Sequence, residues 1–214
     1  MYEQASRLFA ERGFAGTSLQ DIAEAMGMTR PALYYYVKSK DELLAKLVTE
    51  ITEGSAAEIK SVVEGSDIDA VTKLRKIARM LAFGRATQPA RFLLLERSEA
   101  ELPSGLAEAH EAAKRSTLHD LMHVIEEGVA KGQFRPVDPR VAALAVIGMC
   151  NWVAWWYHPG AGRNEADTAE QLADLAVAMI VQASERTPAV SGPRAALALL
   201  RQDLQYLDSV LGPD

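Results

Sequence analysis

The chain has 214 residues and a formal net charge of −6, with 49% hydrophobic and 24% charged residues. This composition is that of a globular protein with a sizeable core, and its acidic balance excludes recognition of nucleic acid by overall charge. The single cysteine excludes an intramolecular disulfide, and no apolar run reaches the roughly 20 residues that span a bilayer. We therefore expect a cytoplasmic protein that does not enter a membrane.

Apolar residues recur at helical spacing along the chain, and Gly and Pro mark the ends of the segments. No short run alternates apolar and polar side chains between turn signals, so strands are not expected. The sequence therefore predicts an all-α protein. In chain order, helices are expected over residues 5–12, 19–26, 29–36, 40–53, 68–81, 104–131, 138–157 and 166–186.

These segments predict three parts. Residues 1–47 form an N-terminal three-helix domain, residues 48–187 a larger helical domain, and residues 188–214 a linker with an extra C-terminal helix. The last helix has a leucine seam of only two heptads, so it docks either on the body of its own chain or on a partner subunit. The seam consists of Leu197, Leu200, Leu204, Leu207 and Leu211.

Capping signals cluster in the first 45 residues. Two helices of about eight residues, joined by a short turn that contains Gly27, predict a helix-turn-helix. Proline is tolerated in the first turn of the second of these helices, where its missing amide has no partner to lose. The expected caps are Thr17 or Ser18 with Gln20 or Asp21, Thr29 ahead of Pro31, and Ser39 with Glu42.

Three successive tyrosines, residues 34–36, follow this turn, and every charged side chain from Met28 to Lys40 is a cation. Successive helical positions are 100° apart, so the three rings cannot all face one core. Phenol and cationic groups on an exposed helix suit contacts with phosphates and bases, and Arg30 is placed to bridge guanine O6 and N7. The expected DNA contacts are Thr17, Ser18, Thr29, Arg30, Pro31, Ala32, Tyr34, Tyr35, Tyr36, Lys38 and Lys40.

The stretch "ASRLFAERGFAGTSLQDIAEAMGMTRPALYYYVKSKDELL" resembles the N-terminal DNA-binding domain of the TetR family of bacterial repressors. The matching positions are Phe9, Gly13, Phe14, Thr17, Ile22, Ala23, Gly27, Leu33, Tyr34, Lys40 and Leu43. Val37 departs from the family's usual phenylalanine, and any arm before residue 1 is short or missing. The resemblance implies a DNA-binding domain, a helical ligand-binding domain and a homodimer formed through the last two body helices.

The larger domain shows no Gly-rich phosphate loop and no paired cysteines. His119 and His123 have the i, i+4 spacing of a metal face, with Asp120 where a metalloprotease has glutamate. The alternatives are histidines that line a ligand cavity or lie at the helix surface. We expect no catalytic centre, no bound metal and no cofactor.

The segment "NWVAWWYHPG" at residues 151–160, with "PARFLLLERSEAELP" at residues 89–103, resembles the TetR-type repressors of fatty-acid and sterol-fragment breakdown. That resemblance implies release of DNA on binding an acyl-CoA thioester. An acyl-CoA needs an apolar tunnel and cations at its mouth. The candidates are Met80, Phe83, Phe92, Leu93, Met122, Trp152 and Trp155 for the tunnel, Arg85, Arg91, Arg97 and Arg115 for the mouth, and His119 as a further lining residue.

Other functions remain open at this stage. A drug- or lipid-sensing repressor would use the same methionines and aromatic side chains without recognising CoA. An activator or architectural protein would bind DNA without a ligand, and a helical metalloprotein would use the two histidines.

Overall fold

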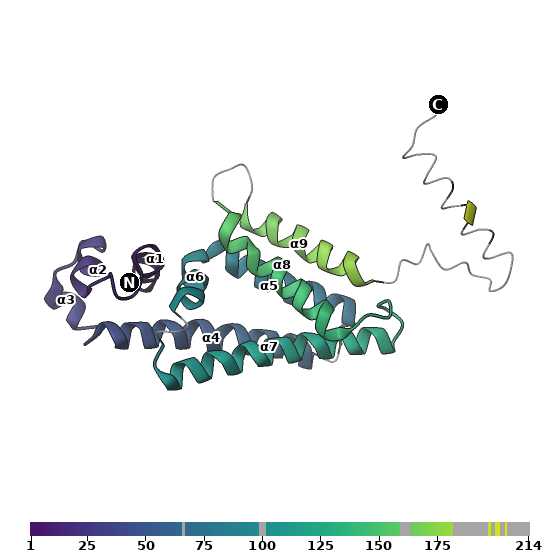
Figure 1. The fold of residues 1–214 in the computed structure, drawn as a ribbon, viewed down its shortest axis with the longest axis horizontal. Coiled ribbons are helices and arrows are strands. Elements are labelled where there is room, and N and C mark those ends of the chain that lie inside the picture. The colour runs from purple at the N-terminus through teal and green to yellow at the C-terminus, as the bar shows by residue number, and fades with distance from the viewer. Residues whose placement is uncertain are drawn as a thin grey trace, which may run out of the picture. The chain divides into compact units, whose positions relative to one another are not determined.

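The computed structural model describes residues 1–65, 67–98, 102–158 and 164–181, together with Leu197, Leu200, Arg201 and Leu204. This part of the chain is built of helices and contains no β-strand, which confirms the predicted all-α class. The helices, labelled in Figure 1, are α1 (Tyr2–Arg12), α2 (Leu19–Ala25), α3 (Arg30–Tyr34), α4 (Lys40–Glu64), α5 (Ala70–Thr87), α6 (Pro89–Ser98), α7 (Ser104–Ala130), α8 (Pro139–Trp156) and α9 (Glu165–Ile180).

Residues 1–180 form one compact unit and residues 181–214 form a second. In the second unit the leucines of the predicted seam that the structure describes, Leu197, Leu200 and Leu204, are exposed. The rest of the predicted segment 188–214, which includes Leu207 and Leu211, lies outside the described residues, as does the end of the helix predicted over 166–186. The docking of the C-terminal helix therefore stays a prediction.

Two glycines with positive φ end helices in the N-terminal domain. Gly13, with φ of 77°, ends α1, and Gly27, with φ of 63°, follows α2 in the turn to α3. A residue with a Cβ is strained in this region, whereas glycine enters it at little cost. The sequence thus fixes both corners of the three-helix domain by local chemistry.

The core of the N-terminal domain extends into the body. Buried side chains from α1 to α4, among them Phe9, Leu33 and Leu43, pack in one hydrophobic cluster with Leu94 and Leu95 of α6. Figure 1 shows α6 beside α1. Because α6 completes this core, residues 1–180 form a single unit without a break near residue 47.

The body consists of packed long helices. Helix α4 runs alongside α7, and α5 packs against α8 and α9 (Figure 1). The Lys73 Nζ of α5 lies 3.0 Å from the Glu127 Oε2 of α7, and both side chains are largely buried. Hydrogen bonds from Lys131 and Lys73 hold the pKa of Glu127 below its ordinary value.

Two helix lengths differ from expectation. Helix α4 was expected to stop near Gly54, but it continues to Glu64 and ends at Gly65. A glycine inside a helix costs only about 1 kcal/mol, which the packing of α4 on α7 exceeds. Helix α3 has 5 residues rather than about eight, since the chain must turn after Tyr35 to bury Val37 and start the cap of α4 at Ser39.

Within the described part of the chain, every helix is too short or too polar to cross a membrane.

Candidate DNA-binding surface and ligand cavity

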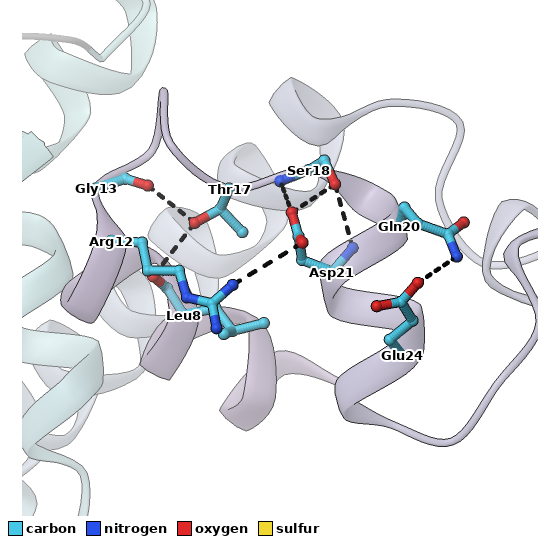
Figure 2. A network of polar contacts seen from close by, with 8 residues as sticks. All are labelled: Leu8, Arg12, Gly13, Thr17, Ser18, Gln20, Asp21 and Glu24. Atoms are coloured by element: carbon cyan, nitrogen blue, oxygen red, sulfur yellow. Dashed lines mark hydrogen bonds and ion pairs between the residues drawn. The ribbon is translucent and has the colours of Figure 1, made fainter.

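A reciprocal capping box begins helix α2. The Ser18 backbone N–H donates to Asp21 Oδ2 at 2.7 Å, and the Asp21 N–H donates back to Ser18 Oγ at 3.1 Å. Figure 2 shows this pair, with Arg12 reaching toward Asp21 from α1. Hydrogen bonds from Ser18 hold the pKa of Asp21 below its ordinary value, so the box is charged at neutral pH.

Thr17 does not lie on the DNA-facing surface, and its side chain is only 2% exposed. Its hydroxyl lies 2.9 Å from the Gly13 carbonyl oxygen and 3.2 Å from that of Leu8, as Figure 2 shows. The expected contact of this side chain with DNA is therefore wrong. Thr17 closes the turn between α1 and α2, whereas Ser18 is exposed.

All three successive tyrosines face outward. Tyr34 is 40% exposed, Tyr35 88% and Tyr36 56%, while Leu33 and Val37 on either side are buried. The rings of Tyr35 and Tyr36 meet edge to face at 5.4 Å between centroids. The short helix α3 thus anchors itself through its flanking aliphatic residues and presents an aromatic surface.

The first turn of α3 lies beside this aromatic surface. Thr29 caps the helix by accepting from the Ala32 N–H at 3.4 Å, and Pro31 is exposed in the first turn. Arg30 is exposed, and its Nη2 donates to the Tyr34 hydroxyl at 3.0 Å. The Tyr34 ring also lies 5.3 Å from the guanidinium carbon. This contact holds Arg30 along the outer face of α3.

The two lysines after the tyrosines differ in their surroundings. Lys38 is exposed, and no ion pair of its ammonium occurs among the described residues. Lys40 is partly buried: its Nζ donates to the Phe14 carbonyl oxygen at 2.7 Å and lies 4.4 Å from the centre of the Phe14 ring. The structure thus gives Lys40 an internal bond between α4 and the turn after α1, and its phosphate contact stays a prediction.

Two adjoining cavities lie in the described part of the body. The larger, about 730 Å³, is lined by α4 to α8, and the smaller, about 350 Å³, by α4 to α6. Both volumes lie in the range of small-molecule sites. Of the predicted ligand contacts, Arg85 and Phe92 line both cavities, Arg115, His119 and Met122 line the larger one, and Met80, Phe83 and Arg91 line the smaller one.

Arg85 lies at the junction of these cavities. Its Nε donates to Asn151 Oδ1 at 3.1 Å, and its guanidinium carbon lies 4.4 Å from the centre of the Phe92 ring. Burial lowers the pKa of this guanidinium from its ordinary value, while the charge of Glu96 acts in the opposite direction. The prediction placed Arg85 at the cavity mouth, and the structure places it, partly exposed, in the lining that the two cavities share.

Trp152 and Trp155 were predicted to line the tunnel, but neither lines a cavity. They are 61% and 42% exposed and stack on each other at 5.4 Å on the outer face of α8. The edge-to-face contact of Trp155 with Phe92 links them to the cavity wall. Leu93 lines neither cavity, and the side chain of Arg97 lies outside the described residues.

Metal binding has no support in the described part of the chain. No group of three or more His, Cys, Asp or Glu side chains gathers there in a way that could hold an ion. His119 and His123 are both exposed on α7.

Several polar residues that line the larger cavity were not predicted from the sequence as ligand contacts. Asn151, Glu96, His110 and Arg140 line the larger cavity. Asn151 stands in the motif "NWVAWWYHPG", but nothing local pairs it with a residue of α5. In the sequence, a polar residue on an otherwise apolar helix face would have been the signal that it lines a cavity.

An exposed helix-turn-helix on a helical body with a ligand-sized cavity defines a class of protein, the regulators that couple DNA binding to a small molecule. The family description "Bacterial regulatory proteins, tetR family" matches residues 2–47, and "Tetracyclin repressor-like, C-terminal domain" matches residues 67–180. The chain belongs to the TetR family of bacterial regulatory proteins.

Relatives within the family cover most of the chain. The HTH-type transcriptional repressor KstR2 of Mycolicibacterium smegmatis is 24% identical over 187 residues, which is 85% of this chain and 89% of KstR2. The HTH-type transcriptional regulator AcrR of Shigella flexneri is 33% identical over 93 residues, 43% of each chain.

Solved structures share the fold. The ketosteroid transcriptional regulator KstR2 of Mycobacterium tuberculosis has a TM-score of 0.77 at 21% identity and covers 85% of this chain and 93% of its own. AibR in complex with isovaleryl coenzyme A and operator DNA has a TM-score of 0.67 at 29% identity, covering 84% of this chain and 95% of its own.

Proposed function

We propose that this chain is a homodimeric repressor that binds operator DNA through α3 and releases it when a largely apolar ligand, an acyl-CoA thioester, enters the body. The observation that carries the proposal is the combination of an outward-facing α3 with a cavity of about 730 Å³ that shares a wall with the core of the DNA-binding domain.

The exposed side chains of α3 fit the major groove. Arg30 is the long base-reading side chain of the first turn, with Thr29, Pro31 and Ala32 beside it, and it suits a guanine. The other contacts we propose, Ser18, Tyr34, Tyr35, Tyr36 and Lys38, reach the sugar–phosphate backbone. In a dimer, two copies of α3 would meet half-sites about 34–36 Å apart.

The outer face of α8 and α9 supports a homodimer. Large apolar side chains are exposed on both helices, and such a face is typical of a surface that another protein covers. A second copy that meets it around a two-fold axis would bury the stacked pair Trp152 and Trp155. The exposed residues of this face are Val141, Trp152, Trp155, Trp156, Leu175 and Met179.

The larger cavity combines an apolar interior with charged residues at its edge. Leu81, Leu95 and Met122 are among its apolar lining, and Lys114, Arg115 and Arg140 add cations. An acyl chain suits the first set and CoA phosphates suit the second. The complex of AibR with isovaleryl coenzyme A lends support. A drug or lipid without CoA is the alternative ligand, and it would use the apolar lining alone.

Helix α6 offers a path from the cavity to the DNA. Leu95 lines the larger cavity and also belongs to the cluster that contains Phe9 and Leu33. A ligand against Leu95 would shift α6 and with it α1, while α4 would tilt from the body side. A coupling of about 1–3 kcal/mol, a change of roughly 5- to 150-fold in DNA affinity, is enough for a response.

The test begins with a duplex that the protein itself selects from a random pool. Fluorescence anisotropy then measures its dissociation constant with acyl-CoA thioesters from short to long chain, free CoA and neutral apolar drugs. Weaker DNA binding and a raised Tm with thioesters, but not with free CoA, support the proposal. A response to drugs or lipids alone favours the alternative, and failure to select any duplex excludes a sequence-specific regulator.

A further inference from the structure

Arg85 is a partly buried cation, and the charge of Glu96 acts on it from beyond ion-pair distance. No carboxylate lies within ion-pair distance of it in the described part of the chain. By contrast, the other arginines that line the smaller cavity are paired: Arg79 Nε lies 3.0 Å from Glu170 and Arg91 Nη1 3.1 Å from Glu50. A charge that is partly withdrawn from water without an ion-pair partner is destabilising, and a ligand of opposite charge would offset that cost.

The contacts of the Arg85 guanidinium leave its two terminal Nη groups available to a ligand. Phe92 covers a face of the guanidinium, and Asn151 takes the Nε–H. The two terminal Nη groups make no hydrogen bond among the described residues, and the side chain lines both cavities. The remaining donors thus form an end-on pair of the kind that holds a planar carboxylate by two parallel hydrogen bonds.

The two cavities meet at this point. They share the lining residues Ile51, Ser55, Ile59, Leu81, Arg85 and Phe92. Apart from Ser55 and Arg85, this shared wall is apolar. A ligand at the junction would therefore keep its apolar body against Ile59, Leu81 and Phe92 while one acidic group meets Arg85.

We propose that Arg85 and Asn151 form a carboxylate-binding site at the junction of the cavities, and that the ligand is an amphipathic molecule with a buried carboxylate on an apolar body. The inference rests on the proposed function, since it names the chemistry of the ligand that the body senses. One Arg with a single free edge suits a carboxylate better than a phosphate, which several cations usually hold. The carboxylate comes either from a free acid or from the far end of a dicarboxylic acyl-CoA.

The experiment compares matched probes by isothermal titration calorimetry on the full chain. Decanoate is set against 1-decanol, and octanedioyl-CoA against octanoyl-CoA, so that each pair differs in the carboxylate. In the wild-type protein the acid of at least one pair should bind about 10- to 100-fold more tightly than its neutral partner. A preference in the first pair identifies a free acid, and one in the second identifies a dicarboxylic thioester.

Three variants locate the preference. Arg85→Met keeps the apolar stem and removes the charge. The acid and neutral probes of each pair should then bind with about equal affinity, and the neutral probes should bind as they do to the wild type. Asn151→Asp supplies an internal carboxylate to Arg85 with almost no change in shape, and it should abolish the preference as well. Arg75→Gln, at an arginine that is paired with Glu170 and lines neither cavity, should leave it unchanged.

Several outcomes overturn the inference. They are equal binding of acid and neutral probes to the wild type, no binding of either acid up to about 1 mM, and a preference that survives both Arg85→Met and Asn151→Asp. Neutral thioesters that release DNA while the acids show no preference would leave the proposed function standing and remove only the carboxylate site.

Discussion

Lys38 and Lys40 are two residues apart, and the structure predicts opposite effects when each is replaced by methionine. Lys38 is exposed near α3, whereas the ammonium of Lys40 is bonded to the Phe14 carbonyl and faces the Phe14 ring. Lys38→Met should therefore change the electrostatics of DNA binding, and Lys40→Met should change the stability of the DNA-binding domain. The two variants have the same change of charge, so each is the control of the other.

The expected magnitudes follow from these surroundings. Each phosphate contact contributes about 0.9 to the slope of log K against log salt concentration, so one Lys38 contact in each protomer of a dimer contributes roughly 1.8. A hydrogen bond from a charged donor contributes about 1.5–3 kcal/mol and the cation–π contact about 0.5–1 kcal/mol. Because Lys40 is partly exposed, we expect Lys40→Met to cost about 1–2 kcal/mol, which lowers Tm by roughly 2–8 °C.

The assay needs no knowledge of the operator. Fluorescence anisotropy with a duplex of arbitrary sequence over a range of salt concentrations gives the slope, and calorimetry gives Tm. Lys38→Met should flatten the slope at unchanged Tm, and Lys40→Met should lower Tm at unchanged slope. If Lys40→Met flattens the slope as much as Lys38→Met and leaves Tm unchanged, the internal role assigned to Lys40 is wrong.

Three further predictions concern the body. Trp152→Glu on the outer face of α8 should convert the proposed dimer to a monomer and weaken DNA binding at least tenfold, measured by sedimentation and anisotropy, and a dimer that persists would exclude this face. Gly128→Ala places a Cβ 2.0 Å from the buried Phe134 ring and should lower stability by about 1–3 kcal/mol, whereas Gly54→Ala, with open space around its Cβ, should raise it by up to about 1 kcal/mol in denaturant titrations. Because the pKa of Glu127 is lowered, its ion pairs stabilise the fold above pH 4.5, its ordinary pKa, and this stabilisation is lost as the pH falls below that value. The wild type should therefore lose about 1–2 kcal/mol of unfolding free energy on acidification, and Glu127→Gln should not.

The parts of the site that depend on neighbouring residues could be predicted from the sequence. Ser18 and Asp21 form the expected capping box, and Gly27 lies in the expected turn, where its φ is positive. The sequence also required at least one of the three tyrosines to face outward, since successive helical positions cannot share one core, and the structure exposes all three. These features need only the geometry of a single turn or helix, which a local stretch of sequence determines.

Features that depend on distant contacts could not be predicted. Thr17 and Ser18 are equal as potential caps, and the Leu8 carbonyl decides which of them turns inward. The bond of Lys40 joins residues 26 positions apart, and that of Arg85 with Asn151 joins residues 66 apart. Helical spacing groups the tryptophans on one face of α8, but it does not tell whether that face lines a cavity.

Leu95 has two roles in this fold, because it lines the larger cavity and also packs in the core of the domain that carries α3. Any substitution of Leu95 that changes the shape of the larger cavity also changes the stability of the DNA-binding domain. Under the proposed function, the inducer specificity of this protein can therefore change more freely at Leu118 or Met122 of α7 than at Leu95 of α6. Residues that can change ligand specificity and residues that maintain the fold thus lie on different walls of the larger cavity.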